Sequence, residues 1–203
     1  MPANTLILID REKIQFNSGG KIITFPISAT LMKDLEIVDK NLFLGELGKF
    51  VQKEGVTFGS TLILLTEAVC FIDEGNPLQD FISTLPFENP TAISLGGKSI
   101  GTNKDLYEAV VELVGKYGGD VKSVAPIFIS KETFGVRNLD EGVAKFVLSN
   151  EEAFLKSYFS FSAPALLTSP VQPKAKVTPL SLKLGIVFAV LAIILVVLLV
   201  LRS

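Results

Sequence analysis

The chain has 203 residues, with 21 acidic and 19 basic side chains, one cysteine and no histidine. Without histidine the most common general base and metal ligand is missing. The single Cys70 cannot form an internal disulfide, which is typical of a reducing compartment. Residues 1–162 carry a net charge of −6 and the rest of the chain +4, and an acidic main domain argues against nucleic acid as a partner.

Residues 1–162 are expected to fold as one mixed α/β domain, which we call the head. Its first half is predicted to hold five strands, over Thr5–Ile9, Lys13–Phe16, Lys21–Phe25, Thr61–Leu65 and Val69–Asp73. Between the third and fourth strands, Asp39 is the expected cap of a helix that reaches about Glu54 and stops at Gly55. The continuous apolar run at Thr61–Leu65 is typical of a buried strand.

The second half of the head alternates helices and strands. Its predicted elements are a short helix opened by Asn76-Pro77, a hairpin of Thr91–Leu95 and Lys98–Thr102 around Gly96-Gly97, a helix from Asn103 to Tyr117, a strand over Val121–Ile129 interrupted at Pro126, and a last helix capped by the pair Asn138 and Glu141. This order predicts a mixed sheet with helices packed on it.

Two further segments follow the head. Residues 163–182 contain four prolines and no acidic residue, which favours an extended, semi-rigid tether. Residues 183–203 include the 18-residue apolar run Leu184–Leu201, which as a helix would span roughly 27 Å, close to the hydrocarbon thickness of a bilayer. The alternative is a buried core helix, but such helices seldom lack polar residues over this length. We therefore expect one C-terminal transmembrane helix.

The flanks of the apolar run predict its orientation. Lys174, Lys176 and Lys183 precede it, whereas only Arg202 and Ser203 follow it. Basic residues tend to stay on the cytoplasmic side, where they also suit an anionic leaflet of the lipid bilayer. The segment Met1–Asp10 has no basic region and no long apolar region of the kind found in signal peptides. The head is therefore expected in the cytoplasm.

Three features of the sequence are candidates for chemical sites. Gly97-Lys98-Ser99 resembles the end of a phosphate-binding loop, but position 92 is alanine rather than glycine and the sequence after it favours a hairpin. Asp10 and Asp73 each follow an apolar strand, where turn formation is the favoured role. The acidic pairs Asp73-Glu74 and Asp140-Glu141 suit a solvated face or a helix start. We therefore assign no catalytic, cofactor-binding or metal-binding residue.

Two apolar features leave alternatives open. Cys70 lies in an apolar stretch and is interpreted as a core residue rather than a reactive thiol. Phe154, Tyr158, Phe159 and Phe161 make the end of the head aromatic. They either pack onto the sheet or contact a partner.

Four stretches resemble a known family. The stretches Leu62–Phe71 (LILLTEAVCF), Leu85–Phe87 (LPF), Ile100–Tyr107 (IGTNKDLY) and Val124–Pro126 (VAP) are similar to the actin-like PilM proteins of type IV pilus assembly and to the related cytoplasmic domain of the type II secretion GspL proteins. The resemblance covers about residues 5–130. It implies an RNase H-like fold, the unit duplicated in actin, and a scaffold role at the inner face of a bacterial inner membrane.

The sequence departs from actin-like ATPases in two ways. Its first hairpin turn, Ile9–Glu12, lacks the glycine that grips phosphate in that family, and the chain is too short for two full units. We therefore expect a non-enzymatic, membrane-tethered scaffold of a type IV pilus or type II secretion-like machine, with the bilayer and other assembly proteins as partners, no cofactor, and homo-oligomers possible. The alternatives are a membrane-bound nucleotide-binding protein of the actin or RNase H class, and a tail-anchored adaptor of an unrelated complex.

Overall fold

The computed structural model describes residues 5–129, 133–156 and 158–161, all of which belong to one compact unit, Met1–Leu166. The expected tether (163–182) and the apolar run Leu184–Leu201 lie outside the described residues. Within the described part of the chain, no helix has the length and apolarity to cross a membrane.

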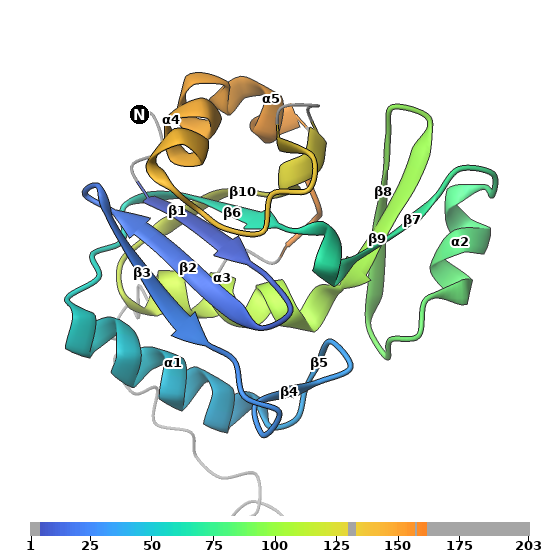
Figure 1. Cartoon of the computed structure of the whole chain (residues 1–203). Coiled ribbons are helices and arrows are strands. Elements are labelled where there is room, and N and C mark those ends of the chain that lie inside the picture. Colours follow the sequence, from blue (N-terminus) through green and yellow to red (C-terminus); the bar gives the residue numbers. More distant parts are fainter. Residues whose placement is uncertain (1–4, 130–132, 157, 162–203) are drawn as a thin grey trace, which may run out of the picture. The chain divides into compact units, whose positions relative to one another are not determined.

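A five-stranded mixed sheet forms the centre of the head (Figure 1). Its strands, in spatial order, are β10 (Asp120–Pro126), β6 (Ser60–Leu65), β1 (Thr5–Ile9), β2 (Lys13–Ser18) and β3 (Lys21–Pro26). The first three strands of the chain form an antiparallel meander, whereas β6 runs parallel to β1 and β10 runs parallel to β6. Parallel neighbours need long crossovers, and each crossover contains a helix: α1 (Lys40–Glu54) precedes β6 and α3 (Lys104–Lys116) precedes β10.

A second, smaller sheet is inserted between β6 and α3. It contains β7 (Cys70–Asp73), β9 (Lys98–Asn103) and β8 (Pro90–Leu95) in that spatial order, all antiparallel. The helix α2 (Leu78–Thr84) packs on it, because a side chain on Gly101 of β9 would meet Phe81 and Leu85. The prediction of a mixed sheet is confirmed. The strands β7, β8 and β9 form a separate sheet because β1 and β10 already pair with both edges of β6.

Side chains alternate between two apolar layers across the main sheet. On β1 and β6, Ile7 and Ile63 point into the larger layer, whereas Leu8 and Leu64 point into the smaller one. Figure 1 shows α1 and α3 on one face of the sheet and the helices α4 (Glu141–Ser149) and α5 (Glu151–Lys156) on the other. Side chains on both faces of β1 and β6 are at most 1% exposed, as Ile7, Leu8, Ile63 and Leu64 show. This burial explains why the sequences of the two strands are nearly continuous apolar runs.

Two of the predicted helices have the expected boundaries. The Asp39 carboxylate accepts a 2.9 Å hydrogen bond from the Leu42 N–H, and Gly55 ends α1 in the left-handed conformation. The Asn103 side chain accepts a 3.0 Å bond from the Asp105 N–H at the start of α3. Each side chain satisfies a helix N–H group that has no partner within the helix.

Two predicted caps were wrong. The last helical region begins after Asp140, whose carboxylate accepts from the Val143 N–H at 2.8 Å, and it is divided at Asn150 into α4 and α5. Asn138 accepts instead from the ammonium group of Lys13. Asn76 does not cap α2 either, because its N–H groups donate to Asp73, and Pro77 holds the cap position.

One small hairpin was not predicted. β4 (Met32–Lys33) and β5 (Glu36–Ile37) are joined by Asp34 and Leu35, whose φ angles are +51° and +67°. Two-residue hairpin turns favour such angles, but glycine or asparagine usually provides them. The side-chain amide of Asn103 donates to the Leu35 carbonyl at 3.0 Å and thereby ties this hairpin to the start of α3.

Candidate functional site

The carboxyl ends of the parallel strands are where open α/β sheets usually bind ligands. Asp10 directly follows β1 at this edge, and Thr66 directly follows β6. The Thr66 hydroxyl donates to Asp10 at 2.9 Å, and the Glu12 N–H donates to the other carboxylate oxygen at 3.3 Å. Asp10 is only 5% exposed. Its carboxylate therefore joins two strand ends and closes the first turn, as the turn interpretation predicted.

A later segment of the chain is bonded to the same edge. The Gly135 N–H donates to the Glu67 carboxylate at 3.3 Å, and the Leu139 N–H donates to the side-chain amide oxygen of Gln15 at 2.8 Å. Asn138, between them, accepts from Lys13. Residues 135–139 thus lie along the edge at which a ligand would be expected. Their backbone N–H groups already bond to the side chains of Gln15 and Glu67.

Asp73 lies in the smaller sheet and forms a turn of its own. Its carboxylate accepts from the backbone N–H groups of Asn76 at 2.7 Å and Gly75 at 3.0 Å, and from the Asn76 side chain at 3.1 Å. The Asn76 N–H, followed by the Gly75 N–H, lowers the pKa of this exposed carboxyl group. Asp73 ends β7 and Asp10 follows β1, so the two aspartates belong to different sheets.

The stretch that resembles a phosphate loop is a hairpin, as predicted. Gly96 and Gly97 have φ angles of +58° and +81° and connect β8 to β9. Lys98 begins β9 rather than a helix, and its ammonium group pairs with Glu74 at 2.5 Å. The arrangement supplies no helix N-terminus at Lys98, which a phosphate loop requires.

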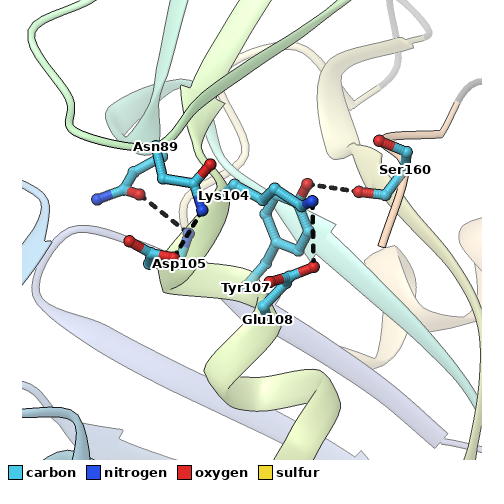
Figure 2. A network of polar contacts seen from close by, with 7 residues as sticks. Asn89, Lys104, Asp105, Tyr107, Glu108 and Ser160 are labelled. Carbon is cyan, nitrogen blue, oxygen red and sulfur yellow. Dashed lines mark hydrogen bonds and ion pairs between the residues drawn. The ribbon is translucent and has the colours of Figure 1, made fainter. Parts of the chain in front are cut away.

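The start of α3 carries a network of polar contacts, drawn in Figure 2. The Lys104 N–H donates to the Asn89 carbonyl at 2.9 Å, and the Asn89 side chain donates to Asp105 at 2.8 Å. One helical turn further, the Tyr107 hydroxyl donates to the Ser160 carbonyl at 2.7 Å. α3 therefore binds both the loop before β8 and the final described residues of the head.

The aromatic residues at the end of the head divide into two groups. Phe154 and Phe159 are at most 1% exposed, and Phe159 lies 6.0 Å from the Tyr107 ring between centroids. Phe161 is partly buried against the same core, whereas Tyr158 is 54% exposed. The packing interpretation therefore holds for all but Tyr158.

Cys70 is half-buried and packs against the larger apolar layer. Burial raises the pKa of its thiol, which keeps the thiol protonated near neutral pH. This agrees with its interpretation as a core residue.

A cleft of about 690 Å³ lies where the β4–β5 hairpin meets the starts of α1 and α3. Lysine and carboxylate side chains from both hairpin and helices line it. Lys40 at this cleft pairs with Glu112 at 2.9 Å, and that hydrogen bond is the main reason why the pKa of Lys40 is raised. The sequence does not indicate this cleft, because the β4–β5 hairpin that forms one wall contains no glycine.

Within the described ranges, no group of three or more cysteine, aspartate or glutamate side chains is placed to hold a metal ion. No protein-family model matches the chain, and no curated protein matches it in sequence.

Proposed function

We propose that the chain is a non-enzymatic, membrane-tethered scaffold of a type IV pilus or type II secretion-like machine at the bacterial inner membrane. In this proposal the head has an RNase H-like, actin-like fold and lies in the cytoplasm, and residues 183–203 anchor it in the bilayer. The head acts by binding other proteins of the assembly.

The strand order supports the fold part of the proposal. An antiparallel meander, followed by two parallel strands that are each reached through a helix, is the arrangement expected of an RNase H-like unit. The small sheet of β7, β8 and β9 is an insertion in that unit, placed between β6 and α3. The described part of the chain contains one five-stranded sheet, which agrees with one unit rather than the pair found in actin.

The observation that carries the scaffold interpretation is the occupied carboxyl edge of the sheet. Asp10 is bonded to Thr66, Gln15 to the Leu139 N–H and Glu67 to the Gly135 N–H. A ligand would have to displace residues 135–139 to reach Gln15 or Glu67, and it would have to compete with Thr66 and the Glu12 N–H for Asp10. This favours protein binding over catalysis as the work of the head.

The way in which the head ends supports a tether. The Phe159 N–H donates to the Val124 carbonyl of β10 at 2.7 Å, and the Ser160 carbonyl accepts from Tyr107. The folded head therefore extends at least to Ser160, which agrees with a proposed tether that begins at residue 163.

Membrane fractionation tests the tether. The full chain is expected to remain in the membrane pellet after washes with high salt and alkaline carbonate, whereas a chain that ends at Lys183 is expected in the supernatant as a folded head. A truncated chain that still pellets after the salt wash, or a full chain that washes off, would contradict the proposal.

The buried Asp10 at the carboxyl edge keeps one alternative open, a nucleotide-binding protein of the actin or RNase H class. Saturation with ATP and magnesium at 100 times a dissociation constant would stabilise the fold by about 2.7 kcal/mol. For a domain of this size that corresponds to several degrees in melting temperature. A shift of this size, abolished by Asp10→Asn, would favour the alternative, whereas the scaffold proposal predicts no shift.

A further inference from the structure

The four edges of the two sheets differ in how they are protected. Exposed edge strands pair readily with other chains, and proteins usually protect them with proline, lysine or a covering segment. β3 begins with Lys21 and ends with Pro26, β8 begins with Pro90, and β10 is bonded to the Phe159 N–H. The remaining edge strand, β7, has neither lysine nor proline.

The two central residues of β7 are large, apolar and exposed. Phe71 is 39% exposed and Ile72 is 42% exposed, and they point to opposite faces of the strand. The Phe71 ring packs edge-on against Phe87 with 5.5 Å between ring centroids, which holds it in place. When a partner adds a strand to a sheet edge, backbone hydrogen bonds give affinity and contacts with side chains at alternate positions give specificity.

The backbone of β7 also has free bonding capacity. In an antiparallel sheet, the backbone N–H and C=O groups of successive residues point alternately to the two sides of the strand. β9 occupies one side of β7. In the described part of the chain, no other backbone group bonds to Phe71 or Ile72. An added strand would therefore find backbone partners on the outer side.

The charge around β7 indicates what kind of strand would fit. Residues 67–80 contain Glu67, Asp73, Glu74 and Asp80 and no basic residue. Lys98 on the neighbouring strand pairs with Glu74, which leaves a surplus of negative charge. The lowered pKa of Asp73 keeps that carboxylate ionised down to acidic pH.

We propose that β7 is a docking edge for an extended segment of a partner protein, with apolar residues at alternate positions in its centre and lysine or arginine at its ends. The segment would add to the small sheet as a fourth strand and contact Phe71 and Ile72 on its two faces. Its basic ends would meet the carboxylates that flank β7. This inference rests on the proposed scaffold function, because it names the surface through which the head would bind a partner.

A second copy of the chain is the less favourable occupant. Two β7 edges related by a two-fold axis would bring two acidic segments together, and the head carries a net charge of −6. The acidic charge around β7 therefore favours a basic, extended partner over a second copy.

Peptide selection tests the proposal. A phage-displayed library of random nine-residue peptides is selected for binding to the full chain in detergent. Enriched peptides are expected to carry alternating apolar residues and basic ends. They should bind Ile72→Lys at least ten-fold more weakly and Glu74→Gln several-fold more weakly, while the control Leu148→Lys, at a 40% exposed site on α4, binds as the wild type does. Hydrogen exchange at Phe71–Asp73 should become slower when peptide is bound.

Three results would overturn the proposal: no enriched peptide, peptides without basic ends, or peptides that bind folded Ile72→Lys as tightly as the wild type. Unchanged melting of that variant establishes that it is folded. A dimer of the full chain that Ile72→Lys dissociates would assign the edge to a second copy instead. Membrane fractionation does not depend on Ile72, so failure of the tether and failure of this docking edge can be distinguished.

Discussion

The hydroxyl group of Tyr107, on α3, donates a 2.7 Å hydrogen bond to the carbonyl of Ser160, which lies 53 residues later in the chain. Next to this bond, the Phe159 side chain is fully buried and its N–H donates to Val124 on β10. The last described residues are thus part of the fold. Tyr107 and Phe159 therefore attach the last described residues to the core of the head.

Replacing Phe159 with alanine should strongly destabilise the head. A fully buried phenylalanine leaves a cavity when it is truncated, and such changes cost about 3–5 kcal/mol. The matched control is Tyr158→Ala, because Tyr158 is 54% exposed and surface changes cost about 0.5 kcal/mol or less. Urea denaturation measures the free energy of unfolding of both variants. Equal losses of stability would mean that Phe159 does not anchor residues 158–161 to the core.

Tyr107→Phe removes one hydroxyl group and keeps the ring. The loss of its bond to Ser160 should lower the free energy of unfolding by about 1 kcal/mol. Tyr117→Phe is the control, because the Tyr117 hydroxyl lies 3.4 Å from the Gly48 carbonyl and makes a weaker bond. Denaturant titration should show the larger loss for Tyr107→Phe, and the reverse order would contradict the role given to this bond.

Thr66→Val tests the buried contact at the carboxyl edge of the main sheet. Valine has nearly the shape of threonine but cannot donate to Asp10, so a buried carboxylate loses a partner at a cost of about 1–3 kcal/mol. Thr66→Ser keeps the hydroxyl group and should lose less. If both substitutions destabilise the head equally, as measured by thermal unfolding, the hydrogen bond is not what holds these strand ends together.

The stability contributed by Asp73 should depend on pH. Its pKa is lowered in the folded state, mainly by the Asn76 N–H. The contribution is therefore fully present above the unfolded pKa of about 3.9 and is lost as the pH falls through the lower folded value. Asp73→Asn resembles the protonated form, so it should be less stable than the wild type at pH 6 and approach it near pH 3. A difference that stays constant between these pH values would refute this assignment.

Local signals in the sequence predicted most of the head. The strands Thr5–Ile9 and Thr61–Leu65 are apolar at every position after the first threonine, because both of their faces are buried. Asp39 and Gly55 mark the ends of α1 through their own cap chemistry. These strands and caps depend on residues that are close in sequence, so the sequence alone predicts them.

Features that depend on distant residues were not predictable. Asn138 suits a helix cap, but Lys13, 125 residues away, bonds to it, and the cap passes to Asp140. The β4–β5 turn uses Asp34 and Leu35 at positive φ, and Asn103 stabilises it from α3. The separate small sheet follows from the pairing of both edges of β6. In each case tertiary contacts outweigh the local preference.

Protection from protease in sealed cells tests the central claim most directly. Protease added outside intact cells should leave the head undigested, and the same protease should digest it once the cells are opened, because Lys174, Lys176 and Lys183 favour a cytoplasmic position for that side of the apolar run. The full chain should meanwhile stay in the membrane fraction. Digestion of the head in sealed cells, or recovery of the full chain in the soluble fraction, would contradict a cytoplasmic, membrane-tethered scaffold.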